Sequence, residues 1–168
     1  SLSLHLYEHV WGDAGERGLP TSTTHLTAID ADGNIATLTQ TLLSLFGSRV
    51  VLPQTGILMN NGIMWFDPEP GKPNSLAPGK RCLTNYCPVI AERGGQRMAV
   101  GASGGRRILP AVQQLLSFVF DYDLDLDTAF HAPRIDASEG GTVVGDTNLA
   151  PEIHRTLHEH FDYVPMRR

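Results

Sequence analysis

Two adjacent threonines and a histidine, Thr23-Thr24-His25, are the residues whose types and position best fit a catalytic role. They follow the loop-like stretch Gly18-Leu19-Pro20-Thr21-Ser22 and open a run rich in β-forming residues. A threonine hydroxyl is a weak nucleophile, but the α-amino group of a chain-terminal threonine can remove its proton. That amine titrates near about pH 8, which suits a base working near neutrality. Cleavage before Thr23 would therefore join nucleophile and base in one residue, whereas in an uncut chain the same residues suit an ordinary strand.

A glycine-rich turn, Val100-Gly101-Ala102-Ser103-Gly104-Gly105, is the second stretch with chemical potential. It links a predicted strand to the start of a predicted helix. Its glycines leave the backbone N–H groups unobstructed, and the helix dipole adds positive charge at this end. Such groups stabilise the oxyanion of acyl transfer, although a plain strand-to-helix turn has the same composition. The turn matches neither the dinucleotide nor the phosphate-loop glycine pattern, so no nucleotide cofactor is predicted.

The other polar clusters predict no metal site and no cofactor. His154 and His158 are four residues apart on a predicted helix that also carries His160, but no third ligand is in register, and an exposed helix face is expected. His25 lies beside the proposed nucleophile, where a terminal threonine needs no histidine base. Four alternating carboxylates lack the glycine and distal glutamate of a calcium loop and predict a solvated turn and helix cap: Asp121, Asp123, Asp125 and Asp127.

The elements that must position the threonines begin with a β-hairpin, predicted over residues 23–29 and 35–42. A two-residue Asp32-Gly33 loop would place Thr24 opposite Thr41. A three-residue loop, with Gly33 in the left-handed conformation, would instead pair Asp30 with Asn34 and place Thr23 opposite Thr41. The second register would give the nucleophile a hydroxyl partner on the same face.

The rest of the chain predicts strands first and helices after, which is typical of an α+β fold with an antiparallel sheet packed against helices. Extended segments are expected at 45–52, at 56–62 as a buried strand, at 87–90 paired with 97–102, and at 142–144. Helices are expected at 106–120, from Asp125 or Asp127 to Pro133, and at 151–160. Residues 67–80 are rich in proline and glycine and predict an ordered surface loop.

Composition narrows the class of protein. The 168 residues, 41% of them hydrophobic, suit one folded domain, and a formal net charge of -5 without a basic stripe argues against nucleic acid as a partner. No apolar run reaches membrane-spanning length and no secretion signal is evident, so we expect a soluble chain, whether cytoplasmic, periplasmic or secreted. Cys82 and Cys87 have neither zinc nor disulfide spacing and are expected to be reduced, buried thiols. Both ends lack a closing element, which suggests a piece of a larger protein.

Several motifs in order resemble the gamma-glutamyltranspeptidase family of N-terminal-nucleophile hydrolases, specifically its catalytic small subunit. The resemblance covers about residues 17–165. Besides Thr23-Thr24-His25, the matching motifs are Asp30-x-Asp32-Gly33-Asn34, Phe46-Gly47, Gly56-Ile57-Leu58-x-Asn60-Asn61, Pro78-Gly79-Lys80-Arg81, Gly101-x-Ser103-Gly104-Gly105-x-Arg107-Ile108 and Ala132-Pro133-Arg134.

The resemblance implies an αββα sandwich, of which this chain is the small-subunit part, and a proenzyme that cuts itself between Ser22 and Thr23. Residues 1–22 would end the large subunit or pro-segment, residues 23–168 would be the small-subunit domain, incomplete at its C-terminal end, and the large subunit would be the partner. Thr41 would support the nucleophile, and the oxyanion hole falls on Gly104 and Gly105. The pair of hydroxyl residues that holds the substrate carboxylate aligns with Thr84 and Asn85, so half of it is altered.

Three departures from the family concern substrate choice. Leu43, Gly62 and Trp65 stand where glutamyl-specific members carry an asparagine, a glutamine or glutamate, and an aspartate. A charged amino-acid head group would lack partners here, which costs several kcal/mol. The pattern is similar to transpeptidase-like amidohydrolases, including cephalosporin acylases and oxamate amidohydrolase, and favours a less charged small-molecule amide. An uncut, inactive precursor piece and a binding module using Trp65 and Phe66 are the alternatives.

Overall fold

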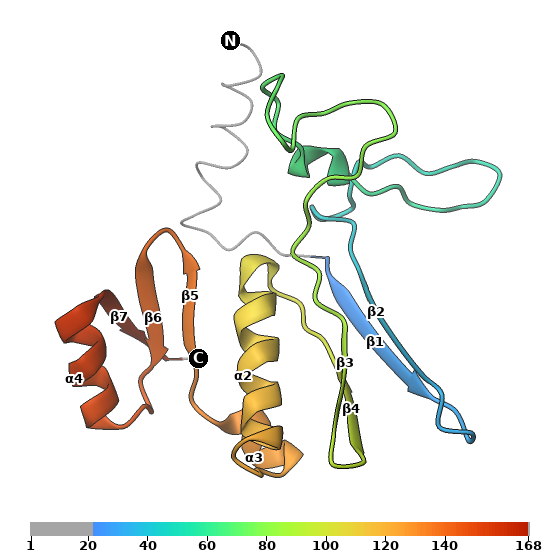
Figure 1. Cartoon of the computed structure of the whole chain (residues 1–168). Coiled ribbons are helices and arrows are strands. Elements are labelled where there is room, and N and C mark those ends of the chain that lie inside the picture. Colours follow the sequence, from blue (N-terminus) through green and yellow to red (C-terminus); the bar gives the residue numbers. More distant parts are fainter. Residues whose placement is uncertain (1–21, 168) are drawn as a thin grey trace. The chain divides into compact units, whose positions relative to one another are not determined.

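The computed structural model describes residues 22–167, which form helices and strands in an α+β arrangement (Figure 1). The predicted linker before Ser22 lies outside the described residues. The chain divides into two compact units. The first combines the described residues up to Thr24 with Gln40–Thr84, and the second combines His25–Thr39 with Asn85–Arg168. No helix in the described part of the chain is long and apolar enough to cross a membrane.

The hairpin of β1 (Thr24–Ile29) and β2 (Ile35–Gln40) has the three-residue loop. The N–H of Asp30 donates to the carbonyl of Asn34 at 3.1 Å, and Gly33, at φ 79°, donates back to the carbonyl of Asp30 at 3.1 Å. The Asp30 carboxylate accepts bonds from the side chain and the N–H of Asn34, so its pKa lies below the usual aspartate value. The register with Thr23 opposite Thr41 is therefore the correct one.

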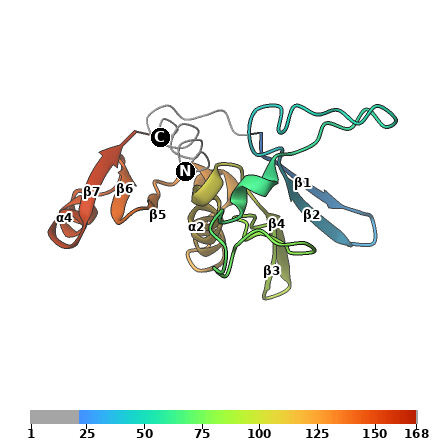
Figure 2. The same cartoon turned by 90° about the horizontal axis from the view of Figure 1, so that it is seen from above.

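The core of the second unit is built around α2 (Ile108–Phe120), which lies alongside the hairpin of β3 (Val89–Arg93) and β4 (Gln96–Val100) in both views (Figures 1 and 2). Apolar residues spaced by three and four along α2 bury one face, as the sequence predicted. They pack with Val100 from β4 and Ala129 from α3 (Leu126–His131), and are Ile108, Val112, Leu115 and Val119. Asp125 caps α3 by accepting from the N–H of Thr128 at 2.9 Å, so the predicted cap is confirmed.

The C-terminal part forms a second cluster that the sequence predicted only in part. The central strand is β6 (Thr142–Asp146). It pairs antiparallel with β5 (Ile135–Glu139) and parallel with β7 (Asp162–Met166). The helix α4 (Pro151–His160) connects β6 to β7. The expectation that the last residues lack an element was wrong, because β7 pairs with a strand twenty residues earlier along the register Thr142↔Asp162. The exposed helix face expected for the α4 histidines is confirmed for His158 and His160. It is wrong for His154, which is half-buried with its Nδ1 2.6 Å from Oη of Tyr163.

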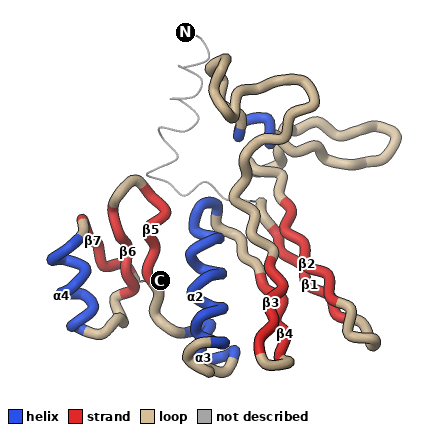
Figure 3. Tube along the Cα trace, in the orientation of Figure 1, coloured by secondary structure: helices blue, strands red, loops and turns tan. Residues whose placement is uncertain are grey.

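The first unit is almost entirely loop between Gln40 and Thr84, apart from the 3₁₀ helix η2 (Gly62–Trp65) (Figure 3). Neither the strand predicted at 45–52 nor the buried strand predicted at 56–62 forms as a regular strand. The two segments meet at the isolated bridge Val51↔Leu58 and through backbone hydrogen bonds from Ser48 to Met59, from Met59 to Val50 and from Leu52 to Ile57, each 2.9 Å long. Most of their large apolar side chains are exposed, among them Val50, Val51, Leu52, Ile57 and Met59. An apolar run becomes a buried strand only where a neighbour covers it, and the sequence pattern does not identify that neighbour.

Two smaller expectations were tested by the same loops. The proline-rich loop is ordered by the bridge Asp67↔Ser75 and by Lys72, whose ammonium lies 3.2 Å from Asp67 and 2.6 Å from Glu69. Cys82 and Cys87 are free thiols, but each is half-buried, not buried as expected.

Candidate active site

The two threonines predicted to face each other do so. The Thr23 hydroxyl donates to Oγ1 of Thr41 at 3.0 Å, and both residues are half-buried. Oγ1 of Thr41 also accepts from the N–H of Leu43 at 2.9 Å. A hydroxyl next to the candidate nucleophile is thus held in place by the backbone of the loop that follows β2.

That loop, residues 41–44, is fixed by Asn61, a residue to which the sequence assigned no role. The N–H of Ser44 donates to Oδ1 of Asn61 at 3.0 Å, and Nδ2 of Asn61 donates to Oγ of Ser44 at 2.8 Å. The N–H of Asn61 donates to the carbonyl of Leu42 at 3.1 Å. Asn61 belongs to the family motif Asn60-Asn61, but its partner is far along the chain, so only the motif hinted at this function.

Leu43 has a left-handed backbone, with φ at 73°. Residues other than glycine, asparagine and aspartate seldom adopt this backbone conformation, which costs them about 1–2 kcal/mol. The turn it makes directs the Leu43 N–H toward Thr41. Backbone strain of this kind is often found at functional sites, and the substrate-facing role of Leu43 stays a prediction.

His25 is held by hydroxyls at both ring nitrogens. Nδ1 lies 2.9 Å from Oγ1 of Thr39, and Nε2 lies 3.1 Å from Oγ1 of Thr27 and 3.1 Å from Oγ1 of Thr37. Gly101 approaches the ring so closely that a Cβ there would lie 2.8 Å from Nε2 and nearer still to Cε1 and Nδ1. The ring therefore fixes the hairpin strands to each other and meets the start of the glycine turn.

The glycine turn needs its glycines for conformational reasons. Gly104 and Gly105 have φ values of 133° and 64°, and the 3₁₀ helix η3 (Gly105–Arg107) leads directly into α2. Within the described residues, no backbone carbonyl accepts from the N–H of Gly104 or Gly105. Asn85 lies beside the turn, with its Nδ2 3.9 Å from where a Cβ of Gly105 would be. Donors of this kind are what an oxyanion requires.

Gly62 and Trp65 are matched to each other. A Cβ at Gly62 would lie 3.0 Å from Cζ3 of Trp65 and 3.0 Å from Oδ1 of Asn60, so the indole and this amide fill the space of a side chain. A glutamine or glutamate at position 62 would require the Trp65 indole to shift by a few tenths of an ångström. Two of the three departures from the glutamyl-specific pattern are therefore direct neighbours. Thr84, the neighbour of Asn85 in sequence, is exposed.

The predicted residues therefore form three local groups. Thr23, Thr41 and Leu43 are one group and Gly62 with Trp65 another, both in the first unit. Asn85, Gly104 and Gly105 are the third, in the second unit. The structure describes each group by itself.

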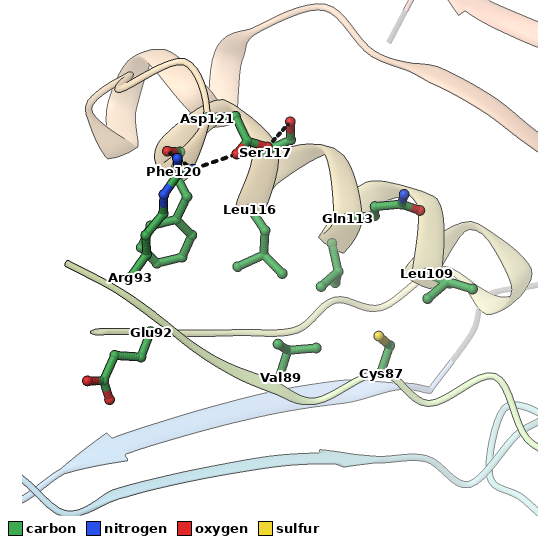
Figure 4. A pocket seen from close by; sticks show the side chains of 11 residues that line it. Cys87, Val89, Glu92, Arg93, Leu109, Gln113, Leu116, Ser117, Phe120 and Asp121 are labelled. Atoms are coloured by element: carbon green, nitrogen blue, oxygen red, sulfur yellow. Dashed lines mark hydrogen bonds and ion pairs between the residues drawn. The ribbon is translucent and has the colours of Figure 1, made fainter. Parts of the chain in front are cut away.

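A separate pocket of about 510 Å³ lies in the second unit between α2 and the β3–β4 hairpin (Figure 4). Its wall is mostly apolar and includes the Cys87 thiol, and at one end Arg93 pairs with Asp121 at 2.6 Å, both more than half exposed. None of the predicted site residues lines it. Among residues 22–167 there is no cluster of three or more side chains suited to hold a metal ion.

Comparison with known proteins agrees with these motifs. The family model described as gamma-glutamyltranspeptidase matches residues 4–164. The acylase ACY 1 proenzyme of Pseudomonas sp. (strain SE83) is 40% identical over 148 residues, which is 88% of this chain and 26% of that protein. The glutathione hydrolase proenzyme of Pseudomonas aeruginosa is 37% identical over 127 residues, 69% of this chain and 23% of that protein. This chain thus spans about a quarter of the length of both relatives.

One solved structure is similar to this chain over most of the length of both. The gamma-glutamyltranspeptidase of Pseudomonas nitroreducens, complexed with L-DON, matches with a TM-score of 0.69 and 31% identity. The match covers 86% of this chain and 82% of the matched chain. That matched chain is therefore about as long as this one.

Proposed function

Because this chain belongs to the gamma-glutamyltranspeptidase family, we propose that it is the nucleophile-bearing part of an enzyme that transfers or hydrolyses acyl groups of amides. The observation that carries the proposal is the 3.0 Å hydrogen bond from the Thr23 hydroxyl to Thr41, at the position where the family motif begins. An ordinary exposed strand does not require this half-buried pair of hydroxyls.

The first step of the proposed chemistry is self-cleavage. The Thr23 oxygen attacks the carbonyl carbon of Ser22, the bond from that carbon to the Thr23 nitrogen breaks, and the nitrogen takes a proton. Water then hydrolyses the resulting ester, which leaves a carboxylate on Ser22 and a free amine on Thr23. Two observations support this step: the relatives are proenzymes, and the similar solved chain is about as long as this piece, not as long as a proenzyme.

The second step is turnover. The free amine of Thr23 takes the proton of its own hydroxyl, and the oxygen attacks the amide carbonyl of the substrate. The N–H groups of Gly104 and Gly105 are the proposed oxyanion donors, which is supported by their unobstructed glycine backbone ahead of η3. The amine of the substrate leaves, and the acyl-threonine ester passes its acyl group to water or to an acceptor amine.

The acyl donor we infer is less charged than a γ-glutamyl group. Leu43 offers no polar side-chain atom, and Trp65 fills the space that a polar side chain at position 62 would need. Thr84 and Asn85 remain as polar partners for a carboxylate. The acylase relative matches 88% of this chain and the glutathione hydrolase relative 69%, which also favours an acylase or amidohydrolase. A γ-glutamyl transferase or hydrolase is the second candidate, since both types are in the family.

The partner we propose is the rest of the same precursor. An αββα sandwich needs two wide sheets, whereas β1–β2 and β3–β4 are two-stranded within the described residues. The free edges and exposed apolar side chains of such two-stranded sheets are usually covered by further strands or helices. Strands and helices of the large subunit would complete both sheets.

The test is made on the full-length precursor, with Thr23→Ala and Thr23→Ser beside the unaltered protein. We expect the unaltered protein and Thr23→Ser to yield two chains by intact mass, the second beginning at residue 23, and Thr23→Ala to stay one chain without amidase activity. Two chains from Thr23→Ala would refute the proposal. The cleaved enzyme is then given an amide with an uncharged acyl group and a γ-glutamyl amide, and faster release from the first supports the acylase assignment.

A further inference from the structure

The hydroxyl of Ser22, the residue just before the proposed cleavage point, sits in a polar setting that the mechanism above does not use. Its Oγ accepts from the N–H of Leu42 at 3.1 Å and lies 3.4 Å from Oγ1 of Thr41. It also reaches two carbonyl oxygens as a donor, that of Ser44 at 3.4 Å and that of Leu43 at 3.5 Å. All of these residues belong to the first unit.

Counting donors and acceptors gives the hydrogen bonds of Thr41 a direction. A hydroxyl oxygen has two lone pairs and one proton. Oγ1 of Thr41 accepts from the N–H of Leu43 at 2.9 Å and from the hydroxyl of Thr23 at 3.0 Å, which occupies both lone pairs. The proton of Thr41 then needs another acceptor, and Ser22 Oγ is the hydroxyl within reach.

The same count applies to Ser22. Its oxygen accepts from the N–H of Leu42 and from the hydroxyl of Thr41, so both lone pairs are used, and its proton goes to the carbonyl of Ser44 or of Leu43. The bond from Thr23 to Thr41 sets the direction at one end, and a carbonyl, which can only accept, ends the chain at the other. The chain runs from Thr23 to Thr41 to Ser22 to a backbone carbonyl.

We propose that the Ser22 hydroxyl is a positioning residue for self-cleavage, which keeps Thr41 as acceptor and Thr23 as donor in the uncut precursor. With this direction, the lone pairs of Thr23 Oγ1 are free to attack the Ser22 carbonyl, and its proton already points at an acceptor. Without the Ser22 hydroxyl, the proton of Thr41 turns to Thr23 and occupies a lone pair of the nucleophile. The inference rests on the proposed self-cleavage and adds no reactant to it.

Cleavage itself removes this control. When the bond between the Ser22 carbon and the Thr23 nitrogen breaks and the ester is hydrolysed, Ser22 becomes the end of the upstream piece. At the same moment Thr23 gains an amine that accepts its hydroxyl proton. The Ser22 hydroxyl would thus serve the first turnover of Thr23 only, and the amine all later ones.

The experiment follows cleavage of the freshly folded full-length precursor by intact mass. The variants are Ser22→Ala, Ser22→Thr, which restores a hydroxyl, and Ser48→Ala as the matched control. Ser48 is an exposed serine of the same unit whose hydroxyl donates to the carbonyl of Met59 at 3.0 Å. We expect Ser22→Ala to cleave about tenfold more slowly, the effect of one lost hydrogen bond in the transition state, and the other two to cleave within about twofold of the unaltered rate.

A second measurement separates positioning from damage to the fold. Ser22→Ala is combined with Thr23→Ala, which keeps the chain uncut. Because the N–H of Leu42 loses its acceptor, the unfolding midpoint should lie slightly below that of Thr23→Ala alone, and the transition should remain cooperative. The inference is wrong if Ser22→Ala cleaves at the unaltered rate, if Ser22→Thr is as slow as Ser22→Ala, or if the uncut Ser22→Ala protein has no cooperative unfolding transition. If Thr23→Ala alone still cleaves, the proposed function fails, and this outcome is distinct from the other three.

Discussion

The contact between Gly101 and the His25 ring gives a prediction whose size follows from the structure. A methyl group at position 101 would lie 2.8 Å from Nε2 of His25 and closer to other ring atoms. Gly101→Ala therefore cannot be accommodated unless the ring moves. The ring is held by three threonine hydroxyls, so it cannot move without breaking hydrogen bonds.

Two terms add to the cost of Gly101→Ala. Forcing a methyl into a filled space costs about 1–3 kcal/mol. Displacing the ring also leaves the hydroxyl of Thr39, a residue that is 7% exposed, without its hydrogen-bond partner, and an unpaired buried hydroxyl costs about 1–3 kcal/mol. We expect the free energy of unfolding to fall by about 3 kcal/mol, in the lower half of the summed range of about 2–6 kcal/mol.

A double-mutant cycle tests the cause. Gly101→Ala, His25→Ala and the double variant are compared by urea unfolding of the full-length precursor, all with Thr23→Ala so that the chain stays uncut. Once His25 is alanine, the methyl has room, so Gly101→Ala should cost less than about 1 kcal/mol and the coupling should reach about 2 kcal/mol. An equal cost of Gly101→Ala with and without the ring would show that the steric argument is wrong.

Three further changes have expected outcomes. Gly62→Ala should displace the Trp65 indole, 3.0 Å from the new Cβ, and shift the tryptophan emission; an unchanged spectrum would contradict the packing. Leu43→Asn should relieve the left-handed strain, raising the free energy of unfolding by up to about 1 kcal/mol in urea titration, and should raise the rate with a γ-glutamyl amide relative to an uncharged one. The hydrogen bonds of Asn34 lower the pKa of Asp30, so this carboxylate stabilises the fold above about pH 4. That stabilisation is lost as the pH falls through the pKa that Asp30 has in the folded protein. Asp30→Asn should therefore flatten the acidic part of a plot of unfolding midpoint against pH.

The parts of the fold that the sequence predicted correctly depend on residues close together in the chain. The β1–β2 register follows from the turn, where Gly33 supplies a φ of 79° and Asp30 bonds to Asn34 four residues on. The start of α3 follows from Asp125 and Thr128, and the buried face of α2 follows from its own spacing. In each case the partner lies within a few residues, so the pattern contains the whole interaction.

The parts that were missed depend on distant partners. β7 contains Pro165, which argues against a strand, and it forms only because β6 offers a parallel neighbour. The segments at 45–52 and 56–62 have strand-like composition and are joined by one bridge and a few backbone hydrogen bonds, but no further strand extends them and most of their apolar side chains are exposed. The composition of a segment indicates whether it can be extended. Whether it is hydrogen-bonded to another strand and covered depends on which other segment lies next to it.

The same distinction explains why the pairing of the Thr23 and Thr41 hydroxyls could be predicted and the loops beside it could not. Thr23 and Thr41 face each other through hairpin register alone, so any chain with this turn and these two threonines keeps the pair. Trp65 occupies the space at Gly62 through a contact inside η2, and Leu43 takes a left-handed turn because Asn61 holds its loop. On the proposed function, substitutions in these loops would alter the acyl group that fits without disturbing the hairpin that positions Thr23. If this separation is correct, Leu43→Asn should change the ratio of rates between two amides while leaving the rate of self-cleavage within about twofold, because the Leu43 N–H that holds Thr41 belongs to the backbone and is retained.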